Sequence, residues 1–331
     1  MAGIDIFNLK KTTISKDLSG KYILLYSKPK VGKTSFAAQL DKNLILATEL
    51  GTNGLDNLSV VPIMKWVDVK NVLKQLRDPR AREMYDTVTF DTISIAADLV
   101  EKFICQRESV DSIRDVPYGQ GWKMVAKELQ ETLREITMLG FGLILICHSK
   151  EKASNYTDED GNPISSVEPD LSKNVYTVAN AICDLIAYIN VEFDKDGKSH
   201  RYLYTRQTPT IFAGSRWKYL APKVEFGYKE LVNAIEDAIE KQKDLDGAVV
   251  TDKQDFTVEE KRPFKDVMEE AKNIWISYLD GAATDEEKES RLNILNDIIT
   301  KTFGRQVKLS QALPSQQDLV ELFIQETKDL L

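Results

Sequence analysis

The run SKPKVGKTS at residues 27–35 holds the residues of this chain that are best suited to bind a phosphate. Gly32-Lys33-Thr34 matches the end of the P-loop (Walker A) pattern G-x-x-x-x-G-K-[ST]. In that pattern backbone N–H groups wrap a phosphate, the lysine reaches the outer phosphates and the hydroxyl ligates Mg²⁺. Ser27 stands where the pattern has its first glycine. A serine can stand here only if the position needs neither a positive φ nor the closest approach of the backbone to the phosphate. Whether the run is a P-loop must therefore be judged from the elements that flank it.

The elements on either side of this run have the order that a P-loop needs. Residues 21–26, KYILLY, predict a buried strand, and residues 34–40, TSFAAQL, favour a helix. A helix that begins at the lysine points its free N–H groups at a phosphate. The sequence therefore predicts ATP and Mg²⁺ as cofactors, with the nucleotide held by Ser27, Lys28, Pro29, Lys30, Val31, Gly32, Lys33, Thr34 and Ser35. The alternative is a surface turn that contains a lysine.

Three further polar side chains lie where predicted strands end. Asp91 closes TVTFD, Glu49 follows NLILAT, and His148 follows GFGLILIC. Ligands of open α/β sheets bind outside the carboxyl ends of the strands. We expect Asp91, with Thr34, to hold Mg²⁺, Glu49 to orient an attacking water, and His148 to sense the γ-phosphate. Simpler roles stay open, since Asp91 can N-cap the next helix, Glu49 can be a solvated residue and His148 can be structural.

Composition argues against several other kinds of site. The 331 residues are 42% hydrophobic and 29% charged, as in soluble globular proteins. Cys105, Cys147 and Cys183 lie far apart in apolar runs, which predicts buried thiols rather than a disulfide or a zinc site. With two histidines and no G-x-S-x-G motif, His-based metal or hydrolase chemistry is disfavoured. No run is long and apolar enough for a membrane span or a signal peptide, so we expect a cytoplasmic protein without a membrane partner.

The overall pattern predicts an α/β core followed by a small helical module. Strands alternate with helices and several are apolar throughout, which is typical of a mainly parallel sheet covered on both faces. We expect the core over residues 1–242, a charged linker over 243–262, and an all-helical module over 263–331. Residues 243–331 hold 12 Lys and Arg against 19 Asp and Glu, whereas the rest holds 32 against 33. The module is therefore acidic, and the core is nearly neutral.

The turn-rich segment after His148 contains DEDGNP, which predicts either a hairpin or a mobile loop. A second hairpin is expected around Asp196-Gly197, between two β-rich runs.

The order of these pieces resembles a phage-borne group of RecA/RadA-like P-loop ATPases, the core-only recombinases associated with single-strand annealing. The resemblance rests on the P-loop, Glu49, Asp91 and four short segments, and it covers about residues 18–242. These segments are YGQGWKMVAKEL (118–129), LILICHSK (143–150), VEPDLS (167–172) and TRQ…AGSRW (205–217). The resemblance implies a RecA-like P-loop NTPase core in which Glu49 activates water, Asp91 is the acidic residue next to Mg²⁺ and His148 senses the γ-phosphate. Ser27 departs from the family pattern and puts the turnover rate in doubt more than nucleotide binding.

The same resemblance implies a homo-oligomer, a ring or a filament, with ATP between subunits. Arg206 and Arg216, with Lys218 as a further possibility, are the candidates for a basic residue that completes the neighbouring site. Taken alone, a residue of this kind is more often a surface ion-pair partner.

Single-stranded DNA would contact two loops of such an assembly. One lies around residues 113–118, and the other follows His148 and carries the candidate DNA-binding residues Lys150, Lys152, Tyr156 and Lys173. The second loop also carries several acidic residues and can be a plain solvated hairpin.

The leading hypothesis is therefore a DNA-stimulated ATPase that acts on single-stranded DNA in phage recombination or replication, in the host cytoplasm. The alternative is a nucleotide-gated interaction protein with little turnover, whose helical module recruits a partner such as a single-strand-binding protein or a helicase. A small-molecule kinase is a weaker third reading, because no arginine-rich lid segment is visible. The acidic module could also shield the DNA loops or mediate oligomerisation.

Overall fold

The computed structural model describes residues 14–15, 20–49, 51, 54–157, 159–251 and 262–330. The chain divides into two compact units, residues 1–258 and 259–331.

The first unit is built on one large sheet that is parallel at its centre. Across the sheet the strands are β11 (Lys223–Glu225), β9 (Ser199–Tyr204), β8 (Leu185–Phe193), β2 (Tyr22–Ser27), β6 (Gly142–Thr157), β5 (Thr87–Asp91), β3 (Asn43–Ala47) and β4 (Ser59–Pro62). All pairings from β8 to β4 are parallel, whereas β8–β9 and β9–β11 are antiparallel. The predicted α/β fold with a mainly parallel sheet is confirmed.

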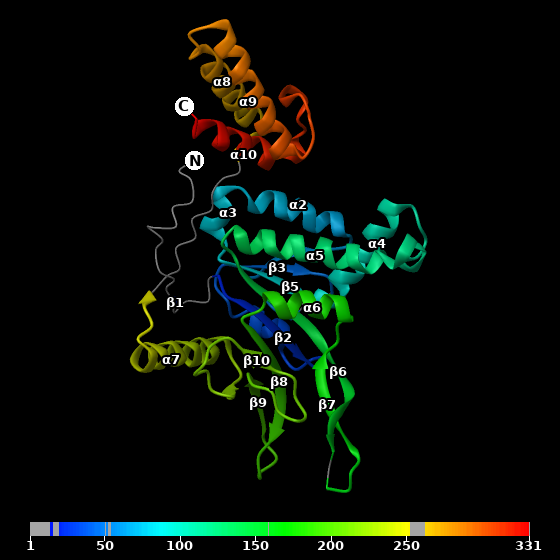
Figure 1. The fold of residues 1–331 in the computed structure, drawn as a ribbon. Helices are drawn as coiled ribbons and strands as arrows, with labels where there is room; N and C mark the ends of the chain where they lie inside the picture. Colours follow the sequence, from blue (N-terminus) through cyan, green and yellow to red (C-terminus); the bar gives the residue numbers. More distant parts are fainter. Residues whose placement is uncertain are drawn as a thin grey trace. The chain divides into compact units, whose positions relative to one another are not determined.

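Helices cover both faces of the sheet, which explains why its central strands are apolar on both sides (Figure 1). Along β2, Leu24 and Tyr26 belong to one hydrophobic cluster, and Ile23 and Leu25 belong to the other. The first cluster includes side chains from α2 (Trp66–Leu76), α4 (Ile93–Glu108), α5 (Gly121–Met138) and α6 (Lys173–Ile182). The second includes side chains from α1 (Lys33–Ala37) and α7 (Tyr228–Asp246). Because strand side chains alternate between the faces, one short strand serves both clusters.

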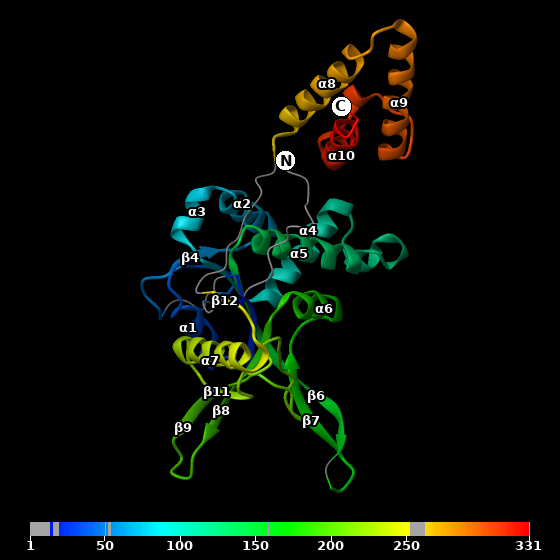
Figure 2. The same cartoon turned by 60° about the vertical axis from the view of Figure 1, so that its left-hand side comes forward.

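Two hairpins extend from the same end of the sheet, as both views show (Figure 2). The first joins β6 to β7 (Pro163–Pro169), and the second joins β8 to β9 around Asp196-Gly197 as expected. The apolar run of β6 ends at Cys147, but the strand continues to Thr157, and residues 148–153, 156 and 157 are exposed or half-exposed. The segment after His148 is therefore a hairpin rather than a loop, and Lys150 and Lys152 lie on a strand.

Several smaller elements differ from the sequence-based expectation. A helix α3 (Pro79–Met84) was not predicted, and it forms because Asp78 caps it and proline is tolerated in a first turn. Helix α7 runs to Asp246, and β12 (Val250–Thr251) pairs with β1 (Ile14–Ser15), so the expected linker begins with ordered structure. Residues 252–261 of that linker lie outside the described residues. Further short elements are η1 (Ile113–Asp115), η2 (Pro117–Gly119) and β10 (Gly214–Ser215).

The second unit is all-helical, with α8 (Phe264–Asp280), α9 (Asp285–Phe303), α10 (Gln317–Lys328) and the short turns η3 (Leu309–Gln311) and η4 (Pro314–Gln316). One stripe of α8 packs into its core, with Val267, Ala271 and Tyr278 buried against residues of α9 and α10. Thr284 caps α9, since its hydroxyl accepts a 3.2 Å hydrogen bond from the Glu287 N–H.

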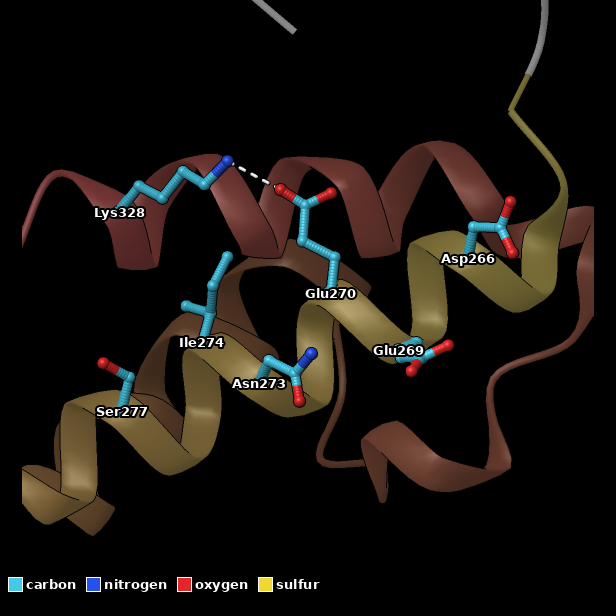
Figure 3. A pocket seen from close by; sticks show the side chains of 7 residues that line it. All are labelled: Asp266, Glu269, Glu270, Asn273, Ile274, Ser277 and Lys328. Carbon is cyan, nitrogen blue, oxygen red and sulfur yellow. Dashed lines mark hydrogen bonds and ion pairs between the residues drawn. The ribbon is translucent and has the colours of Figure 1, made fainter.

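A hollow of about 480 Å³ lies along α8 and α10 of this unit (Figure 3). Its carboxylates include Asp266 and Glu269, and Glu270 is paired with Lys328 at 2.6 Å. None of the predicted site residues lines it.

Candidate nucleotide-binding site

The predicted site residues that follow strands meet at one edge of the sheet because these strands are parallel and in register. Ser27 at the end of β2 lies opposite His148 of β6, and Asp91 at the end of β5 lies opposite both Ile146 and Ala47. Glu49 follows β3 by two residues. Four segments that are distant in sequence thus place their polar residues together.

The loop between β2 and α1 has the irregular backbone that a phosphate cradle requires. Lys30 has φ 64° and Gly32 has φ 115°, so the left-handed region is used twice within three residues. Such alternation turns successive N–H groups toward a common centre and creates an anion-binding concavity. Ser27 is not among the described residues with a positive φ, and it lies fully buried at the end of its strand. The missing first glycine is therefore compatible with this loop.

The Lys33 side chain lies inside the loop. Its Nζ donates to the Ser27 carbonyl at 3.3 Å, to Ser27 Oγ at 3.1 Å and to the Lys28 carbonyl at 3.1 Å. Only 6% of the residue is exposed, and this burial lowers the pKa of its ammonium group, opposed by the negative charges of Asp91 and Glu49. A buried ammonium group whose hydrogen bonds given above go to uncharged carbonyl and hydroxyl groups is a strong donor to phosphate oxygens.

Thr34 and Asp91 supply two oxygen atoms to the same point. Thr34 Oγ1 donates to Asp91 Oδ2 at 2.6 Å. Burial raises the pKa of the Asp91 carboxyl group, while the hydrogen bond from Thr34 lowers it in part. A hydroxyl and a single carboxylate fit Mg²⁺, which takes oxygen ligands and is commonly completed by water and substrate phosphates. The charge of the cation would also offset the cost of burying this carboxylate.

Glu49 and His148 form a second pair beside the loop. His148 Nε2 lies 3.4 Å from Glu49 Oε1, and His148 Nδ1 lies 3.5 Å from Lys33 Nζ. Glu49 Oε1 also accepts a 3.2 Å hydrogen bond from Thr92 Oγ1. About a third of each side chain of the pair is exposed, 35% for Glu49 and 33% for His148. A half-exposed carboxylate held at two points is suited to orient a water molecule next to a phosphate.

The two predicted trans-acting arginines are engaged within their own chain. Arg206 donates to the carbonyls of Ser215 at 2.9 Å and Lys218 at 3.0 Å, and also to that of Trp217. Arg216 pairs with Asp184 at 2.9 Å and donates to the Ala181 carbonyl at 2.8 Å. Their hydrogen bonds in the described structure include none to the P-loop.

The predicted DNA-binding residues do not form a single basic patch. Lys150 lies 3.7 Å from Glu168 and 3.8 Å from Asp170, and Lys152 lies 3.5 Å from Glu168. Lys173 is exposed at the start of α6, and 53% of Tyr156 is exposed. The positive charge of the hairpin is therefore largely balanced by its own carboxylates.

Sequence reasoning missed three residues beside these sites. Thr92 follows Asp91 directly but was not identified as a site residue, and Arg201 contacts the P-loop from a strand 170 positions away. Trp122 is 37% exposed near the loop that contains Tyr118, which is 96% exposed. For Thr92, the signal available in sequence was a hydroxyl next to a predicted metal-binding carboxylate. For Arg201 there was none.

The comparison with protein families agrees with a P-loop assignment. The profile of the AAA_24 family, described as an AAA domain, matches residues 19–217. The SPbeta prophage-derived uncharacterized protein YorG of Bacillus subtilis (strain 168) is 29% identical over 337 residues, which cover 99% of this chain and 99% of that protein. A KaiC-like protein from Pyrococcus horikoshii OT3 is similar at 16% identity and a TM-score of 0.35, over 63% of this chain and 85% of that chain. The flagellar accessory protein FlaH from Methanocaldococcus jannaschii is similar at 14% identity and a TM-score of 0.34, over the same 63% and 85%.

Among the described residues, no helix is both long and apolar enough to cross a bilayer.

Proposed function

The chain belongs to the AAA domain family of P-loop proteins, and from this premise we propose that it hydrolyses ATP and acts on single-stranded DNA in phage recombination or replication. The observation that supports hydrolysis best is the convergence of Lys33, the Thr34–Asp91 pair and the Glu49–His148 pair at one sheet edge. Similarity to a prophage-derived protein over 99% of the chain supports a phage origin, and hence a place in the host cytoplasm.

In the proposed reaction the P-loop holds the β- and γ-phosphates of ATP by its N–H groups and by Lys33. Thr34 and Asp91 would hold Mg²⁺, which when bound neutralises charge on these phosphates. Glu49 accepts a proton as water oxygen bonds to the γ-phosphorus, and the bond to the β–γ bridging oxygen breaks, which leaves ADP and inorganic phosphate. His148, between Glu49 and Lys33, is placed to respond to the presence of the γ-phosphate.

For single-stranded DNA, the features of the loop at residues 113–120 are better suited than those of the β6–β7 hairpin. Tyr118 is 96% exposed, and Trp122, 37% exposed, follows in the first turn of α5. Asn174 donates to the Trp122 carbonyl at 3.4 Å, which places the start of α6, where Lys173 lies, beside the first turn of α5. Aromatic faces stack on bases and lysines attract phosphates without demanding a sequence. We propose that this loop, with Lys173, carries more of the DNA affinity than Lys150, Lys152 and Tyr156.

The proposal includes a homo-oligomer of RecA type with ATP between subunits. Of the two candidate trans-acting residues, Arg216 is favoured, because 59% of its side chain is exposed and it is held by one carboxylate and one carbonyl. Arg206 donates to three backbone carbonyls and would have to break all of them.

The DNA part of the proposal is tested by fluorescence anisotropy of a labelled oligothymidylate, with the full chain and a non-hydrolysable ATP analogue. We expect the analogue with Mg²⁺ to strengthen binding in the wild type and to have no effect in Lys33→Ala. Equal DNA binding with and without the analogue in the wild type, or no DNA binding at all, would contradict it.

A further inference from the structure

The side chain of Arg201, on β9, reaches the outer side of the P-loop. Its Nη1 donates to the Val31 carbonyl at 3.1 Å, across a separation of 170 residues. The same guanidinium lies against the backbone at Gly32, where an added Cβ would be 2.5 Å from Arg201 Nη1. The φ of 115° favours glycine at this position, and the arginine packs directly on it.

This guanidinium also lies over an aromatic ring. Arg201 Cζ lies 4.5 Å from the ring centroid of Phe226, and the Phe226 N–H donates to the Arg201 carbonyl at 3.0 Å. Phe226 in turn packs against Phe36 of α1 with ring centroids 6.0 Å apart. The N–H of Tyr228 donates to Gln39 Oε1, just beyond α1, at 2.9 Å. The segment that orients Arg201 thus also fixes the helix that follows the P-loop.

The hydrogen bond from Arg201 to the Val31 carbonyl determines which way the next N–H group, that of Gly32, points. The carbonyl of Val31 and the N–H of Gly32 belong to one planar peptide and point in opposite directions. With the carbonyl facing Arg201, the Gly32 N–H faces away from the arginine. A charged donor makes a stronger hydrogen bond than a neutral one, and hydrogen bonds in series polarise one another. The guanidinium therefore fixes the orientation of this peptide and makes its N–H a better donor.

We propose that Arg201 is a positioning residue of the nucleotide site, which orients the Val31–Gly32 peptide so that its N–H binds a phosphate. This inference rests on the proposed nucleotide-binding function and adds to it a residue acting in the same chain. Arg201 does not touch the transferred group, so it supports ground state and transition state alike. Its loss is expected to weaken nucleotide binding and to leave kcat nearly unchanged.

Three variants of the full chain separate this role from a merely structural one. Arg201→Met keeps an unbranched apolar side chain over Phe226 but removes the charge and the donors. Arg201→Lys keeps the positive charge and N–H donors but removes the planar guanidinium group. Lys198→Met removes an exposed cation from the same hairpin and serves as the matched control. Titration with a fluorescent ATP analogue in Mg²⁺ gives Kd, steady-state hydrolysis gives KM and kcat, and thermal unfolding gives Tm.

We expect Arg201→Met to raise Kd and KM about five- to tenfold, in line with the loss of one partly exposed charged hydrogen bond, with kcat within about twofold. Arg201→Lys should recover part of the affinity, and Lys198→Met should match the wild type. If Arg201→Met bound the nucleotide with the same Kd as the wild type, this inference would be overturned, while the proposed function would stand. So would a loss confined to kcat, or equal losses in the Met and Lys variants that follow a drop in Tm. If the wild type itself bound no nucleotide, the proposed function would fail first and this inference with it.

Discussion

The hydroxyl of Thr34 donates a 2.6 Å hydrogen bond to Oδ2 of Asp91 and so ties the P-loop helix to the end of β5. The two residues lie 57 positions apart, and β6 separates β5 from β2, the strand that leads into the P-loop. The bond therefore depends on the parallel sheet as a whole. It places the two oxygens expected to hold Mg²⁺ in contact with each other, which links the metal-binding residues directly to the phosphate loop.

Replacement of Asp91 by asparagine should stabilise the metal-free protein and abolish turnover. Because burial raises the pKa of Asp91, the folded state binds its proton more tightly than the unfolded state does. Stability therefore falls as pH rises from the unfolded-state pKa through the folded-state pKa, and the cost is fully present above the folded-state pKa. Asp91→Asn removes that charge and can still accept from Thr34. We expect a higher Tm at pH 7 without Mg²⁺, and hydrolysis at least about 100-fold slower.

The pH dependence provides the control for this variant. The Tm difference between Asp91→Asn and the wild type should shrink as pH is lowered toward 4, where Asp91 becomes protonated in the fold. A difference that stays constant over this range would contradict the assignment of the cost to Asp91.

Thr92 is expected to hold Glu49 in its working orientation. The residue is 1% exposed, and its hydroxyl donates to Glu49 Oε1 at 3.2 Å. Thr92→Val keeps the shape but removes the donor, so kcat should fall about tenfold with KM unchanged. Thr92→Ser should retain activity, and Glu49→Gln should lower kcat by more than Thr92→Val does. Full activity in Thr92→Val, measured by phosphate release, would show that Glu49 needs no such support.

Tyr118 should matter for DNA and not for folding. It is 96% exposed with φ 58°, so it contributes little to the core. If its ring stacks on a base, Tyr118→Ser should weaken oligothymidylate binding about tenfold, since such stacking is worth about 1–3 kcal/mol. Phe193→Ser, at a 72% exposed position on β8, is the matched control for removal of an exposed ring. Equal DNA affinity of Tyr118→Ser and the wild type in anisotropy titrations would exclude the loop at 113–120 as the stacking site.

The three thiols should differ sharply in reactivity. Burial raises the pKa of Cys147 to about 12 and also raises the pKa of Cys183, whereas Cys105 is only half-buried. The thiolate is the reactive form, so Cys147 and Cys183 should resist a disulfide reagent in the native protein. We expect at most one thiol per chain to react before denaturation and three after it. Rapid reaction of two or more in the native state would contradict the burial of β6 and of the segment after α6.

The sequence predicted the parts of the site that follow strand ends. Asp91, Glu49 and His148 could be placed because each follows an apolar run, and parallel strands end at the same sheet edge. The helices of the second unit could be predicted because their apolar residues repeat with helical spacing and are buried together. In both cases a local pattern carried the information.

Features made by contacts between distant segments were not predicted. The full length of β6 could not be predicted, because the strand continues beyond the core and its residues after Cys147 no longer form an apolar run. The pairing of Lys150 with Glu168 depends on hairpin register, which is fixed by the partner strand rather than by either segment. Arg201 meets Val31 only once β9 and the P-loop are folded, and nothing in its local sequence marks it.

Hydrolysis of ATP with and without single-stranded DNA, in the wild type, Lys33→Ala and Glu49→Gln, tests the central proposal most directly. We predict turnover in the wild type that rises with DNA, loss of nucleotide binding in Lys33→Ala, and ATP binding without turnover in Glu49→Gln. ATP binding by the wild type with no turnover under either condition would contradict the proposed ATPase and favour a nucleotide-gated switch that recruits a partner through the helical unit.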